Sequence, residues 1–386
     1  MLPLLLCKYY NFCTENIQTL LEWAGLRFEI PGLSWIIPIG ISFYTFQAYA
    51  YLADVYHGKV RAERNPVVFA LFLSFFPQTM CGPISRAADL LPQFHEPHRF
   101  DAAMCTAGAK IWLWGAFLKT VVADRTGNYV DTVYNNYEHL SGAICLLSSL
   151  LYSIQIYADF AGYSLMAVGI ARCLGFRLVY NFRQPYFASG ITDFWRRWHI
   201  SLSTWLRDYV YIPLGGSRCS QLRTYGNILL TFFVSGLWHG ASWSFILWGL
   251  FHGLFQVIEK WSGLARKHLA GIRKGLYITA TFLAVNLMWI FFRMPTAADA
   301  IGFIQRIFLW QEGSANMPPE KSSILFMAFG ISAMLYRDFR DEYFPTGMRL
   351  FENRHLVVRW SAYLLIIFSI LGIGVLDAGQ FIYANF

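Results

Sequence analysis

Long apolar runs alternate with short polar segments along most of the chain. A bilayer core about 30 Å thick takes roughly 20 residues of helix, so runs near that length are candidate membrane spans. The candidates are Leu33–Ala53, Pro66–Met80, Ala102–Ala123, Ile144–Val168, Tyr225–Trp261, Gly275–Phe292, Ser323–Tyr336 and Trp360–Leu376. Tyr225–Trp261 is long enough for two spans. The pattern predicts a multi-pass membrane protein.

These runs indicate helices, because they lack the alternation of apolar and polar positions that is typical of barrel strands. Pro38 with Gly40, and Ala161 with Gly162, predict kinked or broken helices, which lipid tolerates only beside protein or a water-filled cavity. We therefore expect an all-α fold, a polytopic transmembrane helix bundle with kinked and re-entrant helices around a central tunnel. No repeat or low-complexity linker divides the chain, so residues 1–386 are expected to form one membrane domain.

Composition supports the membrane interpretation. Of the 386 residues, 56% are hydrophobic and 14% charged, against roughly 25% charged in soluble domains. This excludes intrinsic disorder, a disulfide scaffold and a soluble nucleotide-binding enzyme. The net charge of +8 lies in short segments without a nucleic-acid motif, so no nucleic-acid partner is expected. Basic clusters at 266–274 and 337–359 predict cytoplasmic loops, with the C-terminus outside.

The segment Asn181–Arg223 is too charged to span a membrane. On a helix starting near Thr192, one apolar stripe and one polar face are predicted at spacings of three or four. The stripe is Trp195, Trp198, Leu202, Trp205 and Tyr209, and the polar face is Arg196, His199, Ser203 and Arg207. Asp193 and Arg197 form a favourable i,i+4 pair. Two interpretations stay open: a surface helix with snorkelling arginines, or a re-entrant helix whose polar face lies inside the bundle.

His239 lies within an apolar run, in the segment SGLWHGASW. An ionisable side chain at membrane depth usually faces a cavity or a partner, so His239 is a functional candidate, although a satisfied core histidine is the alternative. Gly236 and Gly240 leave room for a substrate or another backbone to approach. His252, in the same run, lacks such a glycine pair and is a weaker candidate.

Several other chemistries are excluded by missing motifs. The chain has no G-x-S-x-G elbow, phosphate loop, H-E-x-x-H motif or dinucleotide fingerprint. Its seven cysteines show no C-x-x-C spacing and are interpreted as small hydrophobic residues. His95 and His98 lie in a charged loop and are expected to be solvated. No metal site is predicted.

Five segments carry a resemblance to a known family. They are IIPIGISFYTFQ (36–47), YADFAGYSLMAVGIA (157–171), NFRQPY (181–186), DFWRRWHISLSTWLRDYVYIPLGGSR (193–218) and SGLWHGASW (235–243). Together they resemble the membrane-bound O-acyltransferase family, and most closely its bacterial alginate O-acetyltransferase branch. The terminal FIYANF also matches. The core that bears most of these motifs is residues 181–261.

The resemblance implies a multi-pass enzyme of the bacterial cytoplasmic (inner) membrane. It implies transfer of an acetyl group from a cytoplasmic donor towards hydroxyls of an exported polysaccharide or cell-wall polymer. Acetyl-coenzyme A is the expected donor, and an acylated carrier is the alternative. No tightly bound cofactor is expected. The expected partners are an extracytoplasmic acetyltransferase of serine-hydrolase-like type and membrane lipid.

The family's catalytic histidine maps onto His239, and its second polar site residue maps onto His199. A histidine with a pKa near neutrality suits the general base that takes the hydroxyl proton. The expected substrate-binding residues are Trp238, Arg196, Ser203 and Arg207. Arg196 suits orientation of the donor or stabilisation of the developing charge. Arg207, Arg218 and Arg223 suit the phosphates of coenzyme A, although the positive-inside rule explains arginines in such a segment equally well.

The chain departs from the family in three places, and two other functions stay open. Family members generally begin with further hydrophobic segments before the equivalent of Lys8–Phe12, so we expect the chain to lack those helices. Leu165 and Ala161 replace a common Asp and Ser. The alternatives are an acyl or glycan transporter or scaffold subunit without transferase activity, and an O-acyltransferase for a lipid or a teichoic-acid-type acceptor.

Overall fold

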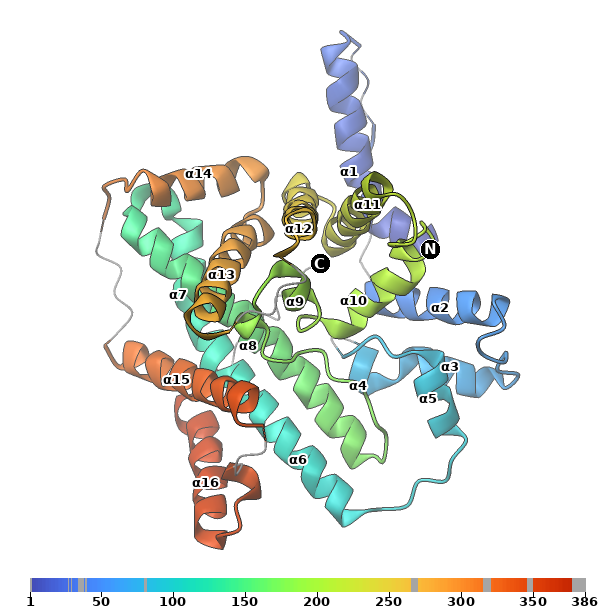
Figure 1. The fold of residues 1–386 in the computed structure, drawn as a ribbon, viewed down its shortest axis with the longest axis vertical. Coiled ribbons are helices and arrows are strands. Elements are labelled where there is room, and N and C mark those ends of the chain that lie inside the picture. The colour runs from blue at the N-terminus through green and yellow to red at the C-terminus, as the bar shows by residue number, and fades with distance from the viewer. Residues whose placement is uncertain are drawn as a thin grey trace.

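The computed structural model describes residues 2–26, 28, 30–33, 38, 40–79, 82–264, 270–314, 321–345 and 350–376. Within these ranges the secondary structure is helical, apart from an isolated bridge between Leu140 and Ser314. Figure 1 shows helices packed around the long α8, with α1 projecting from one end and α15 and α16 at the other. The all-α prediction is confirmed.

The first half of the chain forms α1 (Leu2–Trp23), α2 (Ile41–Tyr56), α3 (Pro66–Ser74), α4 (Phe76–Thr79), α5 (Ala87–Phe94), α6 (Ala102–Phe117), α7 (Asp124–Asn135) and α8 (Gly142–Cys173). The second half forms α9 (Ile191–Trp195), α10 (Ile200–Leu206), α11 (Gln221–His239), α12 (Trp243–Trp261), α13 (Gly271–Arg293), α14 (Ala297–Phe308), α15 (Lys321–Tyr343) and α16 (Leu356–Ile373). A π-helical segment at Leu118–Ala123 joins α6 to α7.

Three helices of the described ranges are long and apolar enough to cross a membrane, namely α8, α13 and α16. The run Tyr225–Trp261 divides into two helices as predicted, because Ser242 interrupts it and caps α12 by accepting from the amide of Phe245. The run Pro66–Met80 does not form one helix, because the chain leaves helical geometry at Phe75, between α3 and α4.

Helix α2 begins later than the apolar run. Its first residue is Ile41, after Gly40 with φ of +75°. A side chain on Gly40 would also collide with the carbonyl oxygen of Thr79, so glycine is required there. Residues 34–37 and 39 of the predicted span Leu33–Ala53 lie outside the described residues.

The predicted break at Ala161 and Gly162 is wrong, because α8 is continuous from Gly142 to Cys173. The glycine serves close helix packing. A Cβ on Gly162 would lie 2.8 Å from the carbonyl oxygen of Gly115 on α6, and one on Gly115 would lie 2.6 Å from that of Gly162. Gly108 and Gly169 make the same reciprocal contact seven residues away. Small residues of this kind let membrane helices approach closely.

The basic cluster at 337–359 is not a loop throughout. Arg337 and Arg340 lie on α15, which extends to Tyr343, and Arg359 lies on α16. Residues 346–349 of this cluster lie outside the described residues. In the other predicted loop, at 266–274, residues 265–269 also lie outside them. The orientation in the membrane stays a prediction.

An aromatic core forms where α8, α9, α12 and α13 meet. The indoles of Trp198, Trp248 and Trp289 are at most 1% exposed. Trp289 lies 4.9 Å from Trp198 and 5.8 Å from Trp248, measured between ring centroids. Aromatic burial on this scale supplies much of a core's packing energy. It fixes the short helices α9 and α10 in the middle of the bundle (Figure 1).

Candidate active site

His239 is the last residue of α11, where the chain turns towards α12. Its side chain is 3% exposed and lies among the rings of Trp238, Trp248 and Phe292, at centroid distances of 4.8, 4.9 and 5.2 Å. All three rings meet the imidazole edge to face. The end of a helix places His239 inside the aromatic core.

The glycines around His239 serve helix packing. A side chain on Gly236 would collide with the carbonyl oxygen of Phe245 on α12, and one on Gly240 would collide with the ring of Phe245. A side chain on Gly249 of α12 would likewise collide with the carbonyl oxygen of Phe232 on α11. For Gly236 the structure therefore shows the approach of another backbone, whereas Gly240 leaves room for the side chain of Phe245.

The segment from Thr192 is not a single helix, contrary to the sequence prediction. Helix α9 ends at Trp195 and α10 begins at Ile200, with a turn between them. In this turn His199 has φ of +41°, in the left-handed region that residues other than glycine rarely adopt. The turn directs His199 away from the expected polar face and buries it completely.

Asn181 holds the turn that carries His199. Its carbonyl oxygen accepts from the amide of Ile200 at 3.0 Å. Its side-chain Oδ1 accepts from the hydroxyl of Ser201 at 2.7 Å and from the amide of Ser201 at 3.3 Å. Asn181 is 1% exposed. Buried polar side chains need such partners, and the asparagine of NFRQPY, to which the sequence assigned no role, supplies them.

The structure brings His199, Trp238 and His239 together. The imidazole of His199 lies 4.7 Å from Phe160 and 6.2 Å from Trp238, so both histidines neighbour one indole. Neither ring nitrogen of His199, nor the indole nitrogen of Trp238, has a hydrogen-bond partner among the described residues. Leaving such groups unpaired in an apolar environment is costly. The arrangement suits a polar ligand between these rings.

The predicted residues Arg196, Ser203 and Arg207 line a different space, a cavity of about 580 Å³ between α9, α10, α11 and α12. Gln256 and Lys260 of α12 also line it. Three cationic side chains around one cavity favour an anionic ligand. His199, Trp238 and His239 do not line this cavity, so the six predicted site residues divide into two groups.

Aromatic rings connect the two groups. Trp195 lines the cavity and lies 5.8 Å from Trp248, which lies 4.9 Å from His239. The indole nitrogen of Trp195 donates to Nδ1 of His252 at 3.1 Å. This bond fixes His252 in the core. The cavity is therefore separated from His239 by two indole rings.

Charged and polar contacts fix α9 in this position. The predicted pair of Asp193 and Arg197 is present, with Nε and Oδ1 2.9 Å apart. Arg197 also pairs with Glu342 on α15 at 2.6 Å. The carboxylate of Glu259 on α12 accepts from the amide of Thr192 at 2.8 Å. Acceptors are favoured at a helix N-terminus because the first amides lack partners within the helix.

The N-terminal helix contributes contacts that sequence reasoning missed. The Lys8 ammonium donates to the carbonyl oxygen of Trp238 at 2.5 Å, and the hydroxyl of Tyr9 donates to that of Leu237 at 2.8 Å. The last carbonyls of a helix lack partners within it, and cationic side chains favour this end. The one signal in the sequence was a single lysine after the apolar residues Leu4–Leu6.

The described residues contain no group of three or more histidine, cysteine, aspartate or glutamate side chains that could hold a metal ion. Around His199 and His239 the described contacts are with aromatic rings. The imidazoles are the titratable groups of this site.

The proteins to which this chain is similar point to one family. The sequence profile of MBOAT, the membrane-bound O-acyltransferase family, matches residues 60–293. The chain is 39% identical to a probable alginate O-acetylase AlgI of Pseudomonas aeruginosa over 359 residues, which cover 90% of this chain and 65% of that protein. It is 39% identical to a peptidoglycan O-acetyltransferase of Helicobacter pylori, over 76% of this chain and 60% of that protein.

A more distant relative is a teichoic acid D-alanyltransferase of Bacillus subtilis, 28% identical over 68% of this chain and 67% of that protein. The chain spans less than two thirds of the length of the Pseudomonas and Helicobacter relatives. The profile nonetheless covers more than half of the chain, including α11, α12 and both histidines. The chain is a multi-pass membrane protein and belongs to the membrane-bound O-acyltransferase family.

Proposed function

We propose that this protein is an O-acyltransferase that moves an acetyl group from a cytoplasmic donor towards hydroxyls of an exported polysaccharide or cell-wall polymer. The observation that carries the proposal is the pair of buried histidines, His199 and His239, beside the indole of Trp238. The indoles of Trp195 and Trp248 connect this pair to the cationic cavity. Relatives named as acetylating alginate and peptidoglycan support the acetyl group and the polymer acceptor.

The chemistry assigns different tasks to the two histidines. His239 takes the proton from the acceptor hydroxyl as its oxygen attacks the thioester carbonyl carbon. His199, with its unpaired ring nitrogens, and the indole N–H of Trp238 orient the acceptor or stabilise the developing oxyanion. The carbon–sulfur bond then breaks, and the leaving thiolate receives the proton. An ester and a free thiol are the products.

The cavity lined by Arg196, Ser203 and Arg207 is the proposed donor site. Its guanidinium groups suit the phosphates of acetyl-coenzyme A, and the hydroxyl of Ser203 is available beside them. In this proposal the chain lies in the bacterial inner membrane, receives its donor from the cytoplasm and passes the acetyl group to an extracytoplasmic acetyltransferase partner. A tunnel past the aromatic rings would connect the two faces.

The test measures transfer of labelled acetyl from acetyl-coenzyme A in membranes that contain the protein and candidate polymers. His239→Asn should lower the rate about 10²–10⁴-fold, the usual contribution of a general base. His199→Asn should also lower it. His252→Asn is the matched control, because the Asn oxygen can replace Nδ1 as the acceptor for Trp195.

Full transfer by His239→Asn at matched expression would refute the assigned mechanism. Loss of transfer by His252→Asn as severe as that by His239→Asn would mean that any disruption of the aromatic core abolishes activity. Labelling of a polymer with an aminoacyl donor instead of acetyl-coenzyme A would identify the teichoic-acid-type reaction named for the Bacillus relative.

A further inference from the structure

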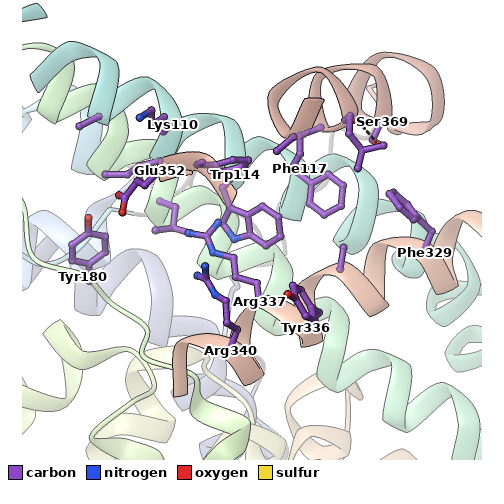
Figure 2. Close-up of a pocket in the computed structure, with 18 of the residues that line it drawn as sticks. Lys110, Trp114, Phe117, Tyr180, Phe329, Tyr336, Arg337, Arg340, Glu352 and Ser369 are labelled. Atoms are coloured by element: carbon purple, nitrogen blue, oxygen red, sulfur yellow. Dashed lines mark hydrogen bonds between the residues drawn. The ribbon is translucent and has the colours of Figure 1, made fainter. Parts of the chain in front are cut away.

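A second cavity lies far from His239 in the fold, between α6, α8, α15 and α16 (Figure 2). Its volume is about 370 Å³, within the range of small-molecule sites. None of the residues assigned above to catalysis or donor binding lines it. The proposed function therefore leaves this space unexplained.

One side of the cavity is strongly cationic. The cations that line it are Lys110, Arg172, Arg337 and Arg340. Glu352 is the one carboxylate among the described residues that line it. Behind the lining, Asp341 pairs with both arginines of α15, and Asp338 interacts with Arg337. The four cations exceed these three carboxylates by one. Figure 2 shows Lys110, Glu352 and Tyr180 together on this side.

Two arginine nitrogens of the site lack an acceptor. Nη1 of Arg337 and Nε of Arg340 are buried and have no hydrogen-bond partner among the described residues. The guanidinium of Arg337 lies 4.3 Å from the ring centroid of Trp114, which holds it in the cavity by a cation–π contact. Buried donors without acceptors are costly, so these groups favour an anionic ligand with several oxygens.

The opposite side of the cavity is apolar. It is lined by Phe117, Phe329, Leu365 and Ile366, and Figure 2 shows Phe117 and Phe329 on the side away from Lys110. Helix α16 is the most apolar of the candidate spans, and 11% of its apolar window is buried. Leu365, at 58%, and Phe368, at 65%, are exposed on it, as expected for a helix whose outer surface lies against hydrocarbon. The cavity joins a cationic site to a lipid-facing surface.

We propose that this cavity binds an anionic phospholipid. The phosphate accepts from Arg337 and Arg340, with Lys110 and Arg172 nearby, and the acyl chains continue along α15 and α16. Basic pockets between membrane helices suit lipid headgroups. A soluble phosphate would use the cationic side alone and would leave the apolar side without a partner.

The test uses the purified full-length chain in detergent, incubated with equal amounts of phosphatidylglycerol and phosphatidylethanolamine and analysed by native mass spectrometry. The unmodified protein should retain phosphatidylglycerol preferentially. Lys110→Gln with Arg340→Gln should weaken that retention about 25-fold, since each cation near a lipid surface contributes about fivefold. Arg273→Gln, which removes an exposed cation of α13, is the matched control.

A cavity-filling variant keeps the proposal falsifiable if the charge variant fails to fold. Ala333→Phe fills the apolar part of the cavity without changing charge and should reduce retention, whereas Ala280→Phe on the exposed side of α13 should not. Unchanged phosphatidylglycerol retention in a folded Ala333→Phe variant would overturn the proposal. Displacement of the lipid by inorganic phosphate at equal concentration would also overturn it, in favour of a soluble anion.

Discussion

The contact between α6 and α8 predicts an unusual effect of a glycine-to-alanine change. A Cβ on Gly162 would lie 2.8 Å from the carbonyl oxygen of Gly115 and 3.0 Å from the amide nitrogen of Lys119. Both atoms belong to the backbone, so no side-chain rotation can relieve the contact. Gly162→Ala must push the two helices apart.

The size of the effect follows from two opposing contributions. Replacing glycine by alanine inside a helix ordinarily stabilises by about 0.5–1 kcal/mol, whereas overpacking a tight contact costs about 1–3 kcal/mol. We expect Gly162→Ala to destabilise by about 1–2 kcal/mol. Gly275→Ala on α13 is the matched control, because no atom lies within 4 Å of its Cβ position, and it should stabilise by about 0.5–1 kcal/mol.

Thermal unfolding of both purified variants in the same detergent, followed by tryptophan fluorescence, measures the difference. The expected separation of about 1.5–3 kcal/mol corresponds to roughly 3–6 °C, taking about 2 °C per kcal/mol for a chain of this size. A melting temperature of Gly162→Ala equal to or above that of Gly275→Ala would refute the close packing of α6 on α8.

Two further predictions concern buried polar groups. The Lys119 ammonium lies 2.5 Å from Oδ1 of Asp124 and 2.7 Å from Oδ1 of Asp159. Lys119→Met should lower the stability by about 3–5 kcal/mol, because it leaves buried carboxylates without their cation. In a melting experiment, adding Asp124→Asn and Asp159→Asn should recover much of that loss. Asn181→Ala should lower acetyl transfer because it releases the turn that carries His199. Added to His199→Asn, it should produce little further loss, and a fully additive loss in the transfer assay would contradict that role.

The sequence predicted the elements whose boundaries are set locally. The length of Tyr225–Trp261 predicted two helices, and the structure sets their boundary at Ser242, which caps α12. The pair of Asp193 and Arg197 follows from helical spacing alone. Such features need no knowledge of what packs against the helix.

The sequence failed where distant partners decide the geometry. The apolar spacing continues through Arg196–His199, so periodicity favours one helix, but Asn181 supplies hydrogen bonds that stabilise a turn instead. Gly162 likewise resembles a helix breaker until Gly115 is known to pack against it. In both cases tertiary contacts override local propensity.

The turn at His199 has a direct consequence for the site. In an uninterrupted helix, His199 would share a face with Ser203 and Arg207, and the histidine would lie in the donor cavity. The left-handed residue instead places His199 beside Trp238, while Ser203 and Arg207 stay on the cavity. The proposed transfer reaction brings donor and acceptor from opposite sides of the membrane. A break between α9 and α10 suits that reaction, because it keeps the cations for the donor phosphates on the cavity and places His199 beside Trp238 and His239, where the acceptor hydroxyl meets the thioester in the proposed mechanism.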